Sequence, residues 1–116
     1  MTVTTHTDVQ QTLAERGDRY GSFEDVAYIA QGLQERMRAA HNGEGWNRLA
    51  ADQKQALTVI ADKIARMLNG DPNYRDNWHD IVGYAALVDK RMARDEQRRA
   101  EAAQAASPKA TGRGRK

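Results

Sequence analysis

The sequence predicts an all-α fold, a three- to four-helix bundle over residues 1–106 followed by a disordered basic tail over residues 107–116. Glycine and proline cluster at residues 17–21, 43–45 and 70–72 and again after Ser107. The segments between these clusters are rich in Ala, Leu, Gln, Glu, Arg and Met, which favour helices. Valine and isoleucine do not alternate with polar residues, so no strand is expected.

The first half of the chain predicts two helices. A short one covers about residues 7–16, and a longer one covers about residues 22–41. Ser22, with Asp25 three residues later, resembles a capping box and marks the second start. Apolar residues then recur at helical spacing and predict a face turned to the core: Val26, Ile29, Ala30, Leu33 and Met37.

The second half predicts two longer helices. One covers about residues 50–69 and stops at Asn69-Gly70. The other begins near residue 72 or 73, because Asp71-Pro72 suits a cap followed by a first helical position, and extends to about residue 106. Their predicted core stripes are Leu57, Ile60, Ala61, Ile64, Met67 and Leu68, then Trp78, Ile81, Val82, Ala85, Val88 and Met92. Residues 107–116 lack the apolar side chains that folding needs, so disorder is expected there.

The composition excludes several classes of function. The chain has no cysteine, which rules out disulfides, cysteine-based zinc sites and thiol catalysis. No segment approaches the roughly 18 apolar residues of a membrane span. The first residues have neither the basic nor the apolar part of a secretory signal. A cytoplasmic protein is therefore expected.

The charge is distributed unevenly along the chain. Residues 1–89 hold nine Lys and Arg against thirteen acids, whereas residues 90–116 hold nine Lys and Arg against three acids. Such a basic C-terminus can bind nucleic acid phosphates without sequence preference. The same composition equally fits a solubilising tail. The basic residues proposed for nucleic acid are Arg98, Arg99, Lys109, Arg113, Arg115 and Lys116.

Acidic and basic side chains lie opposite the apolar stripes of the last two helices. Asp76 and Asp80 stand four residues apart, so their carboxylates repel each other unless a cation compensates. Two or three carboxylates are enough to hold Mg²⁺. We therefore expect a Mg²⁺ site at Asp62, Asp76 and Asp80, although a solvated face would show the same pattern.

Phosphate and nucleotide contacts are expected beside these acids. Lys63 and Arg66 are the nearest basic candidates if the last two predicted helices pack as a hairpin, and either Tyr84 or Tyr20 can contact a base. Arg19 with Tyr20 lies in the glycine-flanked segment 16–21 and can hold a phosphate. Gly83 and Leu87 occupy the same side of the last helix, which suggests a homo-oligomer that buries this side.

Three runs of the sequence resemble a group of small phage and prophage proteins of unknown function. The runs are Glu15–Phe23, Ala61–Asn69 and Asp76–Leu87, and the resemblance covers about residues 12–90. Its elements Lys-x-x-Arg and Asp-x-x-x-Asp-x-x-Gly-Tyr are specific in combination. These proteins are similar, more distantly, to the MazG-like all-α nucleoside triphosphate pyrophosphohydrolases.

The resemblance implies an α-helical dimer or tetramer, Mg²⁺, and cleavage of a nucleotide between its α- and β-phosphates. The pyrophosphohydrolases carry Glu-x-x-Glu on one helix and Glu-x-x-Asp on the next, whereas Asp62 stands alone on its predicted helix in this sequence. A Mg²⁺-dependent pyrophosphohydrolase and a non-catalytic nucleotide-binding relative therefore both stay open. The alternative is a non-enzymatic phage interaction module that binds nucleic acid or a host protein through the basic C-terminus.

Overall fold

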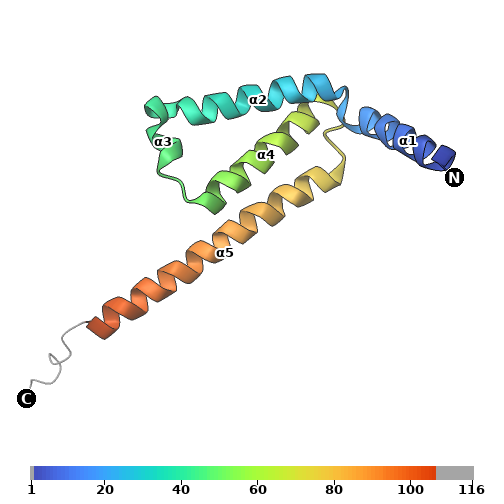
Figure 1. Cartoon of the computed structure of the whole chain (residues 1–116). Helices are drawn as coiled ribbons and strands as arrows, with labels where there is room; N and C mark the ends of the chain where they lie inside the picture. The colour runs from blue at the N-terminus through green and yellow to red at the C-terminus, as the bar shows by residue number, and fades with distance from the viewer. Residues whose placement is uncertain (1, 107–116) are drawn as a thin grey trace, which may run out of the picture. The chain divides into compact units, whose positions relative to one another are not determined.

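The computed structural model describes residues 2–106, with side chains from residue 8 onward. All regular structure in this range is helical, which confirms the all-α prediction. The elements, shown in Figure 1, are α1 (Thr2–Tyr20), α2 (Phe23–Ala39), the 3-10 turn η1 (Ala40–Gly43), α3 (Glu44–Asn47), α4 (Ala51–Asn69) and α5 (Arg75–Ala106). The tail predicted to be disordered, residues 107–116, lies outside the described residues.

The chain divides into two units between Ala85 and Ala86, within α5. The first unit contains α1 to α4 and the start of α5, and the second contains the rest of α5. None of the helices in residues 2–106 combines the length and the hydropathy of a membrane span.

The boundary between α1 and α2 differs from the predicted turn. Helix α1 continues past residue 16, through Gly17, and ends at Tyr20. Gly21 has a φ of +80° and its N–H donates to the Gly17 carbonyl at 2.9 Å, as in a helix C-terminus that closes on a left-handed glycine. Ser22 then caps α2, because its Oγ accepts from the Asp25 N–H at 3.1 Å. The predicted cap is confirmed, but residues 16–20 are the last turn of α1 rather than a loop.

The connection from α2 to α4 is also more structured than the sequence suggested. Helix α2 ends at Ala39, before the predicted residue 41, and η1 follows. His41 and Asn42 have positive φ angles of 52° and 55°, so the chain turns sharply at this point. The Arg38 guanidinium lies over the Trp46 ring of α3, 5.3 Å from its centroid.

 The Arg38 Nη2 also donates to the Gln34 Oε1 at 3.2 Å. Arg38 therefore links α3 to the end of α2.

The turn between α4 and α5 delays the start of α5. Asp71 accepts from the Asn73 N–H through its Oδ1 at 2.9 Å, and its carbonyl accepts from the Tyr74 N–H at 3.3 Å. The Trp78 indole N–H donates to the Pro72 carbonyl at 2.9 Å. Residues 71–74 therefore form a side-chain-stabilised turn, and α5 begins at Arg75 rather than at the predicted residue 72 or 73.

This turn packs closely against the end of α1. The Asp71 N–H donates to the Arg19 carbonyl at 2.6 Å, and the Asn69 Nδ2 donates to the Tyr20 carbonyl at 2.9 Å. A Cβ on Gly70 would overlap the backbone of Arg19 and Tyr20. Only glycine fits this approach, which fixes the junction of α1 and α2 against the C-terminus of α4.

Small side chains form the centre of the first unit. Val26 and Ala30 of α2 cluster with Ala65 of α4, and Tyr20 and Ile29 pack against them. Elsewhere on α4, Ala56, Ala61 and Met67 are buried. Because alanine has a short side chain, α2 and α4 approach each other closely.

The prediction of the large apolar core residues is wrong for several positions. Five side chains assigned to core stripes are exposed in the single chain: Leu57, Leu68, Trp78, Val82 and Met92. Ala85 is exposed as well. On α4 the buried contacts use alanines beside Leu57 and Leu68, so these large side chains flank the contact rather than fill it. On α5, among the described residues, only Asn77 is buried.

Candidate functional site

Two ion pairs join the charged residues that the sequence singled out. The Lys63 Nζ lies 2.9 Å from the Asp80 Oδ2 and links α4 to α5. One turn further along α4, the Arg66 Nη2 lies 3.0 Å from the Asp62 Oδ2. The Lys63 side chain is only 14% exposed, so its ammonium is held in a partly desolvated position. The four charges thus stand in two neutral pairs on one side of α4.

A pocket of about 330 Å³ opens at these pairs. Helices α2, α4 and the first turns of α5 all contribute to its wall. The lining residues are Gln34, Thr58, Val59, Asp62, Lys63, Asp80 and Tyr84. The pocket therefore offers one ammonium, two carboxylates, polar neutral groups and one phenol ring to a ligand.

The electrostatics of this pocket favour an ionised Asp80. The hydrogen bond from Lys63 and the positive charge of its ammonium hold the pKa of the Asp80 carboxyl below its usual 3.8. Partial burial opposes this lowering of the Asp80 pKa, and electrostatic interactions with His79 and Arg66 add to it. Asp80 is therefore a carboxylate at neutral pH, as a metal ligand or an ion-pair partner must be.

Stacked arginines and tyrosines lie next to the pocket, towards the C-terminal end of α4. The Arg66 guanidinium lies over the Tyr20 ring, 4.8 Å from its centroid, and the Arg19 guanidinium lies 4.7 Å from the centroid of Tyr74. The two rings meet edge to face, with centroids 6.2 Å apart. These contacts orient both guanidinium groups, which lowers the entropic cost of binding an anion.

Asp76 belongs to this aromatic group rather than to the pocket. Its Oδ2 accepts from the Tyr74 hydroxyl at 2.8 Å. This hydrogen bond is the main reason why the pKa of Tyr74 is raised above its usual 10.0. Asp76 and Asp80 therefore interact with different partners, although they stand on the same helix.

A second cavity, of about 360 Å³, lies beside the pocket between α1, α2 and α4. Asp62 lines both spaces, and its partner Arg66 lines the second. Tyr20 and Val26 form part of the apolar wall of this cavity. The exposed side chains of Phe23 and Leu13 line its edge. An apolar cavity with a few charged groups is typical of sites for small organic ligands.

The structure brings together part of the predicted site. Asp62, Lys63, Asp80 and Tyr84 line one pocket. Tyr20 and Arg66 line the adjoining cavity, and Arg19 stacks on Tyr74 next to them. Asp76 lies outside both spaces. Within residues 8–106, no group of three or more acidic or histidine side chains is placed to hold a metal ion.

Several residues of the site were not predicted from the sequence. Gln34 is a buried polar side chain in the apolar stripe of α2, one turn after Ala30 and two turns after Val26. Its polarity at that position was the available signal. Thr58 and Val59 carry no such signal, and Tyr74 became important only through its stacking with Arg19 and Tyr20.

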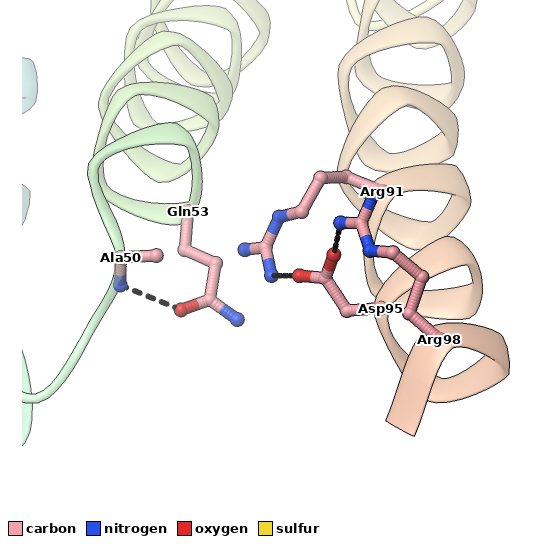
Figure 2. Close-up of polar contacts among 5 residues, drawn as sticks. All are labelled: Ala50, Gln53, Arg91, Asp95 and Arg98. Carbon is pink, nitrogen blue, oxygen red and sulfur yellow. Dashed lines mark hydrogen bonds and ion pairs between the residues drawn. The ribbon is translucent and has the colours of Figure 1, made fainter. Parts of the chain in front are cut away.

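The residues proposed for nucleic acid all belong to the second unit. Arg98 pairs with Asp95, which also binds the Arg91 Nη1 at 3.0 Å (Figure 2). These hydrogen bonds, the one from Arg91 first, lower the pKa of Asp95. Arg99 is exposed on α5. Lys109, Arg113, Arg115 and Lys116 lie outside the described residues.

The fold and the site together define an all-helical protein with a mixed-charge pocket on its central helix. A family model described as a domain of unknown function, DUF6378, matches residues 6–92. The chain therefore belongs to the DUF6378 family, and the match includes every residue of the pocket. No curated protein and no solved structure matches the chain significantly.

Proposed function

We propose that this domain binds a nucleoside triphosphate together with Mg²⁺ at the pocket between α2, α4 and the start of α5. The observation that carries the proposal is the convergence of Asp62, Lys63 and Asp80 on one pocket with the ring of Tyr84. These are residues that the sequence pattern had assigned to a metal, to phosphates and to a base.

The paired charges suit a ligand that carries both signs. A Mg²⁺–triphosphate offers a cation to Asp62 and Asp80 and an anion to Lys63 and Arg66. Binding would then exchange the two internal ion pairs for contacts with the ligand, so that none of the four side chains loses an oppositely charged partner. Mg²⁺ keeps several water molecules and needs only one or two carboxylates beside the phosphates, so the two acids of the pocket fit it.

The neighbouring apolar cavity supports a place for the nucleoside. It shares Asp62 with the pocket, and Tyr20 forms part of its wall. A base held there would lie against an aromatic ring while its phosphates reach Lys63. Tyr84 provides the alternative ring within the first pocket. Either arrangement uses an aromatic residue that the sequence had proposed for this role.

Two outcomes at this site remain distinct within the proposal. In the pyrophosphohydrolase form, water attacks the α-phosphorus, the bond to the oxygen bridging to the β-phosphate breaks, and a nucleoside monophosphate and pyrophosphate leave. Bound Mg²⁺ would supply charge neutralisation on the phosphates. In the binding form, the same residues hold the nucleotide without cleavage, as in a non-catalytic relative of the MazG-like enzymes from a phage or prophage.

Calorimetric titration of the full chain with a panel of nucleoside triphosphates, with and without Mg²⁺, tests the proposal. We expect Mg²⁺-dependent binding, reduced about 10- to 100-fold by Lys63→Met, since a hydrogen bond to a charged group contributes about 1.5–3 kcal/mol. Lys90→Met removes the same charge from an exposed position outside the pocket and serves as the matched control. A pyrophosphate-release assay on any bound nucleotide separates the two forms.

Absence of binding across the panel, in a chain whose circular dichroism shows the expected helix content, would refute the proposal. Equal losses in Lys63→Met and Lys90→Met would also count against the pocket, because the contact would then depend on net charge alone. Asp80→Asn adds a separate check, since it should weaken the binding of Mg²⁺–nucleotide more than that of free nucleotide.

The second candidate function is non-specific nucleic acid binding through the basic C-terminus. It rests on the excess of Lys and Arg over acids in residues 90–116 and on the exposure of Arg94 and Arg99 along α5. Binding to a DNA duplex should weaken steeply with added salt. Deletion of residues 107–116 should weaken it and leave nucleotide binding intact; DNA binding that neither this deletion nor replacement of Arg94 and Arg99 by glutamine reduces would contradict the assignment.

A further inference from the structure

The helices of the first unit present two unlike sides. Helix α4 lies between α2 and the start of α5 (Figure 1), and it contacts α2 through Ala65 and α5 through the ion pair of Lys63 with Asp80. The pocket and the cavity open on one side of this arrangement. We refer to the opposite side as the apolar face.

On α4, this opposite side carries a row of large apolar residues. At about 100° per residue, Leu57, Ile64 and Leu68 stand opposite Asp62 and Arg66. Leu57 is 37% exposed and Leu68 is 69% exposed. Ile64 is half-buried. The row therefore leaves apolar surface exposed along this side of the helix, most of all at Leu68.

The start of α5 continues the same face. Trp78 and Val82 stand opposite Asp80 and Tyr84 on the helix and are 53% and 65% exposed. Ile81 is half-buried at a position between this row and the side of α5 that faces α4. The apolar face thus consists of Leu57, Ile64, Leu68, Trp78 and Val82, none of which carries a charge.

An exposed apolar face of this kind requires an explanation, because the buried core beside it is small. In the described residues the buried hydrophobic side chains are Val26, Met67 and four alanines, at positions 30, 56, 61 and 65. Contiguous apolar surface on a soluble domain commonly marks a site of protein association. Covering the large side chains would supply the apolar burial that the alanines cannot.

Residues 107–116 do not carry the side chains that this cover would need. Residues 107–116 are Ser-Pro-Lys-Ala-Thr-Gly-Arg-Gly-Arg-Lys and contain no large apolar side chain. The face also has no charge with which to select a charged partner. A second copy presents an identical uncharged face, and a two-fold axis would bring the same patch of each copy together.

We propose that the apolar face is the interface of a homodimer in which Leu68 and Val82 of each copy pack against the other copy. The result is two layers of helices around a shared core, the arrangement that a single amphipathic layer needs. This interface differs from the side of Gly83 and Leu87 expected from the sequence, because Leu87 stands two turns after Asp80 on its side of α5.

Light scattering coupled to size-exclusion chromatography of the full chain tests the proposal. We expect a dimer that becomes a monomer in Leu68→Glu and in Val82→Glu, with the dimer Kd raised at least about 100-fold, as for truncation of interface hot spots. Tyr28→Glu is the matched control, because Tyr28 is 83% exposed on α2 but lies outside the face. Leu87→Glu tests the side expected from the sequence.

A wild-type chain that is monomeric at tens of micromolar would overturn the proposal. So would a dimer that persists in both Leu68→Glu and Val82→Glu, or one that Leu87→Glu alone disrupts. Because a glutamate can also unfold a variant, a second measurement uses the absence of cysteine from the chain. At high protein concentration, Leu68→Cys should react with an alkylating reagent at least about tenfold more slowly than Tyr28→Cys. Upon dilution, the two variants should react equally fast. Equal rates at both concentrations would refute the interface.

Discussion

The two sides of α4 differ in how their side chains are satisfied. On one side, Asp62 and Lys63 are neutralised by Arg66 and Asp80, and two cavities lie next to them. On the other side, Leu68 has neither a charge to pair nor sufficient cover. Charges that are already paired can exchange partners with a ligand, whereas an apolar surface is satisfied only by burial. This comparison is the basis for proposing ligand binding on one side and association on the other.

Both sides of α4 depend on two buried positions, one on α4 and one on α5. Ala65 is completely buried where α4 meets α2, and Asn77 is 1% exposed on α5. The Asn77 Nδ2 has no hydrogen-bond partner in the described part of the chain. Changes at these two positions disturb the helix contacts themselves and should have the largest effects.

The largest effect is expected for Asn77→Asp. The substitution keeps the shape of the side chain but places a carboxylate where almost no water reaches, and an uncompensated buried charge costs about 3–5 kcal/mol. Urea denaturation at pH 7 measures this loss. Asn47→Asp, at an exposed position, is the control and should change stability little. Equal losses in the two variants would show that Asn77 is hydrated.

A smaller loss is expected for Ala65→Leu. The larger side chain would push α2 and α4 apart, and overpacking of this kind typically costs about 1–3 kcal/mol. It should also widen the pocket and weaken nucleotide binding, because Gln34 and Lys63 lie on the separated helices. Ala93→Leu introduces the same side chain at an exposed site of α5 and should be nearly neutral. A neutral Ala65→Leu would mean that the helices are not in close contact.

Much of this helical architecture could be predicted because its signals are local. The Ser22 cap and the Gly70 stop depend on neighbouring residues, and both positions agree with the structure. The start of α5 was misplaced because the Asp71 side chain stabilises a turn that competes with the helix. The burial pattern failed for a different reason. An apolar stripe shows that a face must be covered, but it does not show whether this chain provides the cover.

The candidate site was predictable where its residues share a helix face. The spacing of Asp62 and Arg66 placed both on one side of α4, although the pattern assigned them to a metal and to phosphates rather than to the ion pair that they form. The same spacing did not separate Asp76 from Asp80, since only the fold shows that Tyr74 binds the first and Lys63 the second. Likewise, the stacking of Arg19 on Tyr74 joins segments far apart in the sequence. Partners contributed by distant segments require the fold.

A stabilising effect of moderate size is expected for Gly83→Ala. A Cβ at Gly83 would meet no atom within 4 Å, and alanine favours a helix interior by about 1 kcal/mol over glycine. Gly70→Ala is the opposite case, since its Cβ would overlap backbone atoms of Arg19 and Tyr20. Thermal unfolding of both variants should therefore shift in opposite directions. A loss of stability in Gly83→Ala would indicate a close contact at Gly83, such as the oligomer interface first expected there.

The smallest expected effect is the pH dependence of stability that the Lys63–Asp80 ion pair contributes, which the uncharged apolar face on the other side of α4 should lack. Because Lys63 lowers the pKa of Asp80 in the folded chain, the ion pair stabilises the fold above the usual pKa of 3.8 and loses this contribution as the pH falls below it. The difference in stability between the wild type and Asp80→Asn should thus be constant near neutral pH and shrink under acid conditions. The Asp80 side chain is 43% exposed, so the difference should be modest and decrease with salt. If the stability difference between the wild type and Asp80→Asn stays constant down to pH 3, the ion pair contributes nothing. Dimerisation through the uncharged apolar face should not change across the same pH range.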